Sequence, residues 1–166
     1  MKALFITLKE LKRKSIFDGN IDADKLIQFV EVAQDTNIQQ YLGTALYNRL
    51  QADIIANTLS GNYLTLVNDY IKPMLIWYTQ STILPYIMFS ITNGGVGKHI
   101  SENSETATHD DMTYLGHRMN DTAEFYTKRF LDYMCSYSNL YQEYTSSSNE
   151  DMHPDRDVNY TGGWYI

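Results

Sequence analysis

The stretch YLTLVNDYIKPMLIWYTQSTILPYIMFSI, residues 63–91, is the most apolar part of the chain. Its apolar side chains are spread almost all the way round a helical projection, which predicts a helix buried in the centre of a helical bundle. Pro73 and Pro85 are expected to kink this helix or to divide it into consecutive pieces. A membrane span of similar length is disfavoured by Lys72, by the polar run at 79–82 and by both prolines.

Helical spacing continues on the N-terminal side of this segment. Asp22 or Asp24 can cap a helix whose apolar residues recur from 26 to 33. The polar residues 35–37 are expected to break that helix and to cap a second one, which ends near Asn57. Two helices are therefore predicted before the central one.

A long helix is predicted on the C-terminal side. Asp110 and Asp111 at its start suit the positive end of the helix dipole, and the helix is expected to fade near Tyr144. The residues of its predicted inner stripe follow three-four spacing: Leu115, Met119, Thr122, Tyr126, Phe130, Tyr133 and Tyr137. The remainder of the chain is polar and broken by proline and glycine, so it is not expected to form a core element.

Together these segments predict an all-α fold, a bundle of about four main helices with a long kinked central helix. The bundle is expected to occupy residues 1–144, with a loop at 92–109 that projects from it and an extended arm at each end. The C-terminal arm, residues 145–166, ends in a cluster of large apolar side chains at 164–166. A free tail has little use for such a cluster, so we expect this arm to dock on a neighbouring molecule.

The composition restricts the class of protein. The 166 residues suffice for one domain with its own core. The net charge is −7 and the one notable basic cluster spans residues 9–14, so a dedicated nucleic-acid-binding surface is not expected. The single cysteine, Cys135, excludes an intrachain disulfide and a multi-cysteine zinc site. The start of the chain lacks the features of a signal peptide, which predicts that the protein stays in the cytoplasm where it is made.

The chain contains 14 tyrosines, which are spread along its length. Tyrosine combines a large contact area with a hydroxyl group that tolerates water, so it suits protein–protein interfaces. Tyrosines can equally flank an amphipathic helical core. The sequence leaves both interpretations open.

The stretch SITNGGVGKHISENSE, residues 90–105, has the glycines and the lysine of a phosphate-binding loop. The spacing is wrong for that role, because Gly97 and Lys98 are followed by His99 where the motif requires serine or threonine. We expect the preceding helix to end near Thr92, where asparagine and glycine can adopt the positive φ angles that terminate a helix. The contact residues predicted from this loop and from the C-terminus are Asn93, Gly94, Gly95, Gly97, Lys98, His99, Trp164, Tyr165 and Ile166.

The other polar residues form no legible catalytic site. His117 and Asp121 lie one helical turn apart, with Asp110 and Glu124 on neighbouring turns, which could form half of a metal site in a bundle. No matching Glu-x-x-His occurs on another helix, so a solvated helix face is the simpler interpretation. The acidic residues at 150–157 lack the central glycine and the final glutamate of a calcium loop. We therefore expect no catalytic residue, cofactor or metal.

Several segments, taken in order, resemble a known family. They are LIQFVEVAQDTNIQQYLGTALYNRL at 26–50, YIKPMLIWYT at 70–79, ITNGGVGKHISENSE at 91–105, DTAEFYTKRFLDYM at 121–134 and DMHPDRD at 151–157, with GGW near the end. In their order and spacing they are similar to the head–tail connector (adaptor) proteins of tailed bacteriophages, and most closely to the ring proteins of crAss-like bacteriophages. The resemblance covers nearly the whole chain.

The resemblance implies a structural virion protein and not an enzyme. Such subunits form a ring of about twelve copies below the portal, which joins the capsid to the tail and gives DNA a passage without sequence-specific binding. The direct partner would be the portal, a neighbouring ring or the tail hub, and the protein would reside in the virion neck after assembly in the bacterial cytoplasm. Two alternatives stay open: a small metal- or nucleotide-dependent enzyme that uses Asp110, His117 and Asp121 or Lys98, and a helical regulatory protein that binds a host factor.

Overall fold

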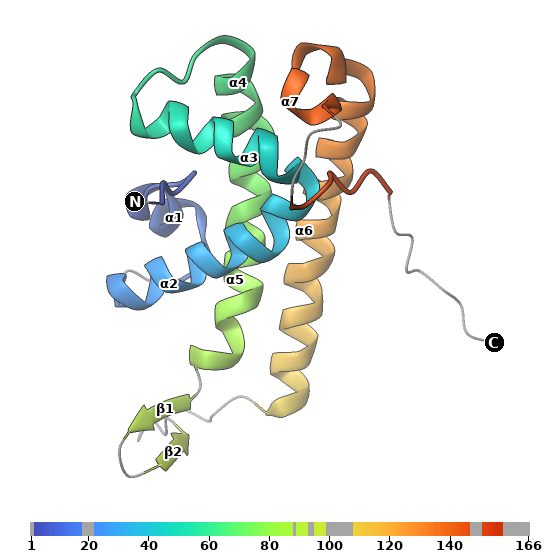
Figure 1. The fold of residues 1–166 in the computed structure, drawn as a ribbon. Coiled ribbons are helices and arrows are strands. Elements are labelled where there is room, and N and C mark those ends of the chain that lie inside the picture. The colour runs from blue at the N-terminus through green and yellow to red at the C-terminus, as the bar shows by residue number, and fades with distance from the viewer. Residues whose placement is uncertain are drawn as a thin grey trace, which may run out of the picture.

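The computed structural model describes residues 2–17, 22–87, 89–92, 95–98, 108–146 and 151–157. In these ranges the chain is a helical bundle, which confirms the predicted all-α fold (Figure 1). The α-helices are α1 (Leu8–Lys14), α2 (Ala23–Ala33), α3 (Gln39–Ile55), α4 (Gly61–Thr65), α5 (Lys72–Ile87), α6 (His109–Tyr137) and α7 (Gln142–Thr145). Two π-helical segments, η1 (Gln34–Ile38) and η2 (Leu66–Ile71), and one 3-10 helix, η3 (Ser138–Leu140), continue neighbouring helices.

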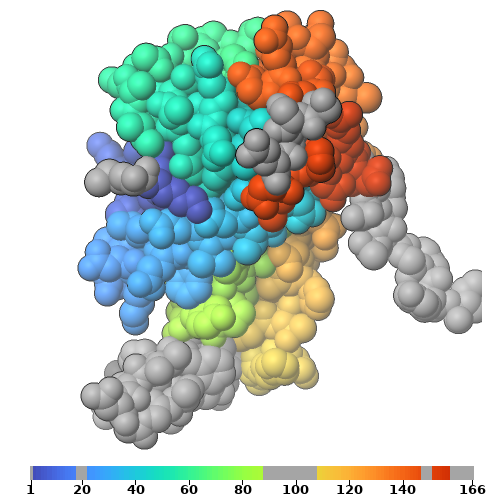
Figure 2. Space-filling model, viewed as in Figure 1, coloured from blue at the N-terminus to red at the C-terminus, as the bar shows by residue number. Residues whose placement is uncertain are grey.

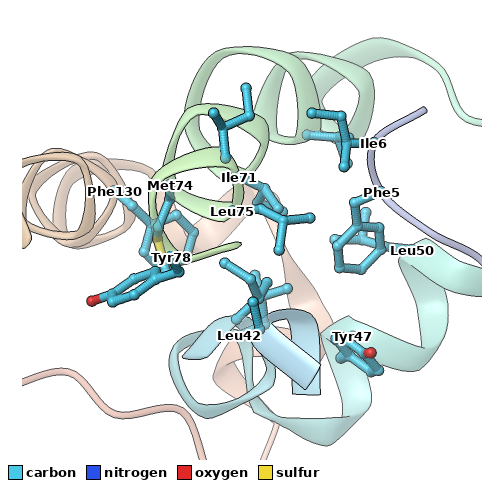
Figure 3. Packing of buried hydrophobic residues seen from close by; sticks show 14 of the residues in the cluster. Phe5, Ile6, Leu42, Tyr47, Leu50, Ile71, Met74, Leu75, Tyr78 and Phe130 are labelled. Atoms are coloured by element: carbon cyan, nitrogen blue, oxygen red, sulfur yellow. The ribbon is translucent and has the colours of Figure 1, made fainter. Parts of the chain in front are cut away.

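Helix α5 runs through the middle of the bundle, with α6 packed along it and α2 and η1 against other parts of its surface (Figure 1). The core lies where α3, α5, α6 and the N-terminal segment meet (Figure 3). The buried side chains labelled there are Phe5, Ile6, Leu42, Tyr47, Leu50, Ile71, Met74, Leu75, Tyr78 and Phe130. Within the described ranges, no helix is both long and apolar enough to cross a membrane.

The central helix passes its first proline without being divided. Helical conformation is continuous from residue 61 to residue 87, through α4, η2 and α5. Pro73 has no N–H to donate, and the π-helical segment η2 directly precedes it, with the Lys72 N–H bonded to the carbonyl of Val67 five residues earlier. The wider π turn accommodates the proline, and Pro85 lies within the last turns of α5.

The break predicted at residues 35–37 is wrong. The Asp22 side chain caps α2 as expected, but the helix then continues through η1 into α3. The break occurs instead at Gly43, whose φ of 72° and ψ of 156° interrupt α3. Such a combination is open to glycine and strained for other residues.

Helix α6 begins with a capping box in which the side chains of Thr108 and Asp111 each bond the other residue's main-chain N–H. It ends at Tyr137, earlier than predicted, and a short helical turn in α7 follows. Its inner stripe is rotated relative to the predicted one, because Leu115 and Tyr137 are exposed. The side chains that are buried are Met119, Ala123, Thr127, Phe130, Leu131 and Met134.

The N-terminal arm packs into the core of its own subunit. The fully buried amide of Gln34 accepts a hydrogen bond from the Phe5 N–H at 2.9 Å and donates one to the Ala3 carbonyl at 2.9 Å. A second buried amide, that of Gln80, accepts a hydrogen bond from the Ile16 N–H at 2.9 Å. Two buried glutamines therefore supply partners for main-chain groups of the arm, as a neighbouring strand would.

A two-stranded antiparallel hairpin stands in place of the predicted helix end. Strand β1 (Phe89–Thr92) pairs with β2 (Gly95–Lys98), with Phe89 opposite Lys98 and Thr92 opposite Gly95. Helix α5 ends at Ile87, so the prediction of a helix that ends near Thr92 is wrong. The hairpin lies beyond the ends of α5 and α6, where the sequence predicted a projecting segment (Figure 1). Residues 93, 94 and 99–107 of that segment lie outside the described residues.

Candidate functional site

The last described segment of the chain contacts α3 at its break. Residues 151–157, which we call the C-terminal strap, lie against α3 at Gly43 (Figure 1). A Cβ atom on Gly43 would come within 2.7 Å of Cγ and Cδ of Pro154. Glycine is therefore required at position 43 for two reasons: the backbone angles are strained for other residues, and the proline ring leaves no room for a Cβ atom.

Main-chain hydrogen bonds join the strap to both sides of this break. The Thr44 N–H donates to the Met152 carbonyl at 2.9 Å, and the Asp155 N–H donates to the Gln40 carbonyl at 2.9 Å. In a regular α-helix, the Thr44 N–H would donate to the Gln40 carbonyl. The strap thus satisfies both groups that the break separates.

Side chains reinforce the same contact. The Thr44 hydroxyl accepts a hydrogen bond from the Met152 N–H at 3.0 Å and donates one to the Asp151 carboxylate at 3.2 Å. The Gln40 amide donates to the Asp155 carboxylate at 3.2 Å. Most of the strap is exposed, so hydrogen bonds dominate this contact and buried apolar area contributes little.

A cavity of about 270 Å³ lies between the end of α6 and the strap. Its lining residues are Leu131, Met134, Cys135, Ser138, Tyr144 and Arg156. Arg156 closes one side, because its guanidinium donates to the Tyr144 carbonyl at 3.0 Å and lies 5.1 Å from the centre of the Tyr144 ring. Burial raises the pKa of Tyr144, although Arg156 opposes the shift. The cavity is slightly smaller than most ligand pockets, and its one charged side chain is already bonded.

Tyrosines from α4, η2, α6 and the segment after it form a cluster within the subunit. The hydroxyl groups of Tyr133 and Tyr141 are 2.9 Å apart, and the ring of Tyr70 stacks on that of Tyr133 at 4.1 Å. Tyr63 donates to the Glu143 carboxylate at 2.7 Å, and burial followed by this bond raises the pKa of Tyr63 to about 12. These tyrosines stabilise the fold of the subunit itself, which supports the second of the two interpretations for this group.

Large apolar side chains are exposed at several places, among them Ile16, Ile55 and Phe125, and a further group shares one end of the molecule. It lies on what we call the distal end of the molecule, which comprises residues 85–87 of α5, the hairpin β1–β2 and residues 109–118 of α6. The exposed fractions there are 57% for Tyr86, 39% for Ile87, 67% for Tyr114 and 37% for Leu115. None of residues 109–118 is buried, so the first turns of α6 extend beyond the core.

The predicted contact residues fall only partly within the described chain. Gly95, Gly97 and Lys98 lie on strand β2 at the distal end. The others lie outside the described residues: Asn93, Gly94, His99, Trp164, Tyr165 and Ile166. The structure therefore brings three of the nine predicted residues to one place.

The candidate metal-binding residues are solvated. Asp110, His117 and Asp121 are all exposed, and Asp121 lies 4.0 Å from the Arg118 guanidinium. In the part of the chain that the structure describes, no group of three or more histidine, cysteine, aspartate or glutamate side chains could hold a metal ion. The exposure of these side chains is typical of a solvated helix face.

Sequence reasoning missed the contact between the strap and α3. The available signal was Gly43, a glycine inside a helical pattern, which often marks a break or a close backbone approach. Residues 40 and 155 are far apart in sequence, and no local pattern pairs them. The hairpin also had a signal, since Asn93 followed by Gly94 favours a two-residue turn between strands.

The fold and these surfaces define a class: a small all-α protein whose C-terminal strap is joined to a broken helix and whose distal end exposes apolar side chains. The chain belongs to a family of unknown function (DUF6712), whose model matches residues 38–153. The matched region includes both partners of the hydrogen bond between Thr44 and Met152, whereas Pro154 and Asp155 lie beyond its end. No curated protein and no solved structure matches the chain.

Proposed function

We propose that this protein is a structural subunit of the head–tail connector of a tailed bacteriophage. In this proposal about twelve copies form a ring below the portal, which joins the capsid to the tail and gives DNA a passage without sequence-specific binding. The direct neighbours are the portal, another connector ring or the tail hub. The protein is assembled in the bacterial host cytoplasm and resides in the neck of the virion.

The observation that carries the proposal is the distal end. There, Tyr86, Ile87, Tyr114 and Leu115 are exposed on helix ends that extend beyond a core with many fully buried side chains. Exposed apolar groups at one end of a small protein favour an interaction site, because they leave water only when another molecule covers them. In the proposed ring, a neighbouring molecule covers the distal end of each subunit.

The charge of the chain supports the same role. The net charge of −7 disfavours tight binding to the DNA backbone, since such binding depends on lysine and arginine that displace counterions. A passage for DNA works best when its wall does not hold the DNA. The order of the segments that resemble connector proteins, from residue 26 to residue 157, is the further support.

Electron microscopy tests the proposal. Recombinant protein, alone and co-expressed with the portal protein of the same bacteriophage, is expected to give annular particles in negative stain. Particles in which the ring sits on one face of the portal would support the position in the neck. Monomers that persist in the presence of the portal would contradict the proposal.

A further inference from the structure

We infer that neighbouring copies of this chain bind through two oppositely charged faces on opposite sides of the subunit. The basic face comprises Lys9, Arg13 and Lys14 of α1, and the acidic face comprises Asp110, Asp121 and Glu124 of α6 together with Tyr114 and Phe125. The inference rests on the proposed ring and identifies the two surfaces that form its subunit contact.

Helix α1 concentrates positive charge in an acidic protein. Lys9 and Arg13 are one turn apart and lie on the side of α1 opposite the fully buried Leu11. Within the described ranges, Lys9, Arg13 and Lys14 form no ion pair. Their charges therefore face solvent and are available to a partner.

The acidic residue of α1 does not neutralise this face. The Glu10 carboxylate is bound by the Lys72 ammonium at 2.9 Å and caps the helix through Thr7. Ile16, which follows the helix, is exposed beside the basic residues. The basic face thus offers both charge and an apolar side chain to a partner.

The acidic face lies on the outer side of α6. Asp121 and Phe125 are two residues before and after the buried Ala123, which places them on the side of the helix away from the core. Tyr114 lies about two turns before Asp121 on the same side, and Glu124 is exposed beside Phe125. Two exposed aromatic rings therefore lie among charged side chains of α6, in which the carboxylates outnumber the cations.

Helix α6 as a whole keeps a small negative charge. It contains the carboxylates Asp110, Asp111, Asp121, Glu124 and Asp132 against the cations Arg118, Lys128 and Arg129, which leaves a net charge of −2. Arg118 lies at the limit of an ion pair with Asp121, at 4.0 Å, and both side chains are largely exposed. A pair of this kind contributes little and leaves the face available to a stronger cationic partner.

The helices that carry the two faces lie on opposite sides of the molecule. Figure 2 shows the surface of α1 on one side of the molecule and that of α6 on the opposite side. A closed ring with one subunit per repeat joins two different patches head to tail, so complementary patches on opposite sides suit it. Contact between two identical faces would bring like charges together, which the same electrostatics disfavours.

The test reverses the charge of each face in a separate variant and then reverses the charges of both faces in one chain. The basic-face variant carries Lys9→Glu, Arg13→Glu and Lys14→Glu, and the acidic-face variant carries Asp121→Lys and Glu124→Lys. Each variant alone is expected to lose about tenfold or more in association constant, measured by sedimentation velocity at low ionic strength. The chain with both reversals, and an equimolar mixture of the two variants, are expected to regain association to within about threefold of the wild-type value.

Lys25→Glu and Glu31→Lys, single charge reversals of each sign on the exposed side of α2, serve as controls outside the two faces, and their association is expected to equal that of the wild type. Circular dichroism of every variant checks that the helices persist. A combined variant that folds but does not regain association overturns the inference, as do single variants that assemble like the wild type.

The outcomes also separate this inference from the proposed function. Rings that form normally in both reversed variants overturn the charged contact and leave the connector function standing. A wild-type chain that stays monomeric, with and without the portal, overturns both. If the basic-face variant assembles normally and loses retention of duplex DNA instead, the basic face serves nucleic acid and the inferred contact is wrong.

Discussion

Gln40 and Thr44 are four residues apart in α3, yet each bonds through its main chain to the C-terminal strap. The Gln40 carbonyl accepts from the Asp155 N–H and the Thr44 N–H donates to the Met152 carbonyl, both at 2.9 Å. Main-chain groups that leave a helix need other partners, and here one segment supplies both. The strap therefore completes α3, and the break in α3 fixes the position of the strap.

Gly43→Ala is expected to destabilise the protein by about 2–4 kcal/mol, because alanine at a φ of 72° is strained and its Cβ would meet Pro154 at 2.7 Å. The free energy of unfolding from urea titration measures the loss. Faster hydrogen exchange at the Thr44 amide would show that the strap has separated from α3.

Two controls separate the backbone strain at Gly43 from the clash with Pro154. Gly61 also has a positive φ, of 57°, but no atom of the described chain lies within 4 Å of the position that an added Cβ would take there, so Gly61→Ala is expected to cost less, about 1 kcal/mol. Repeating Gly43→Ala in a chain that ends at residue 150 removes the clash and keeps the strain. An equal loss in the long and short chains would show that Pro154 plays no part.

Gln34→Leu is expected to cost about 2–4 kcal/mol, since the buried amide is the partner of both the Phe5 N–H and the Ala3 carbonyl. Leucine keeps much of the volume and leaves both main-chain groups without a partner. Thermal or urea unfolding measures the loss. Gln28→Leu on the exposed side of α2 is the matched control and is expected to change stability by less than about 0.5 kcal/mol.

The N-terminal segment gives a second measurement for the same variant. If the Gln34 amide holds the arm, trypsin is expected to cleave after Lys9 faster in Gln34→Leu than in Gln28→Leu. Equal cleavage rates would mean that the apolar contacts of Phe5 hold the arm without the amide.

The main helices follow from periodicity, whereas their interruptions depend on tertiary contacts. Residues 35–37 have the composition of a cap, yet the Thr36 hydroxyl donates to the Val32 carbonyl at 2.7 Å and Asp35 accepts from the Tyr47 hydroxyl at 2.8 Å. Partners within the helix and across the core thus satisfy side chains that would otherwise favour a break. A local sequence pattern does not reveal a hydrogen-bond partner such as Tyr47.

The candidate site could be predicted only in part for the same reason. The apolar run at 63–91 predicts a buried helix because a helix that is apolar on all sides has to be covered on all sides. The structure is helical over most of this run. The contact of Thr44 with Met152 joins residues more than a hundred positions apart, and its hydrogen bonds use the main chain, which is the same for every sequence. The exposed distal end becomes visible only once the core is known.

The ion pair between Glu10 and Lys72 is expected to make stability depend on pH. The hydrogen bond from Lys72 holds the pKa of Glu10 below its usual value, so the stabilisation is present above the unfolded pKa and is lost as pH falls through the folded pKa. Glu10→Gln is therefore expected to cost about 0.5 kcal/mol at pH 7 and nothing at a pH below the folded pKa. Urea unfolding at a series of pH values measures this difference.

High salt provides the control for that prediction. Both groups are partly exposed, so about 1 M salt is expected to reduce the difference between Glu10→Gln and wild type at pH 7. A difference that stays constant between pH 7 and the acid limit would assign the effect to helix capping through Thr7 and not to charge.

Replacing Tyr114 and Leu115 with serine is expected to leave the fold intact and to weaken assembly of the proposed ring, since Tyr114 is 67% exposed and Leu115 37% exposed in the single subunit. The thermal midpoint should fall by no more than about 2 °C, whereas the concentration needed for half-maximal assembly should rise about tenfold. Ile55→Ser, which changes a similarly exposed side chain near the end of α3, is the matched control and should change neither value. If the distal variant assembles as the wild type does while the control is impaired, the contact surface lies at the α3 end of the molecule instead.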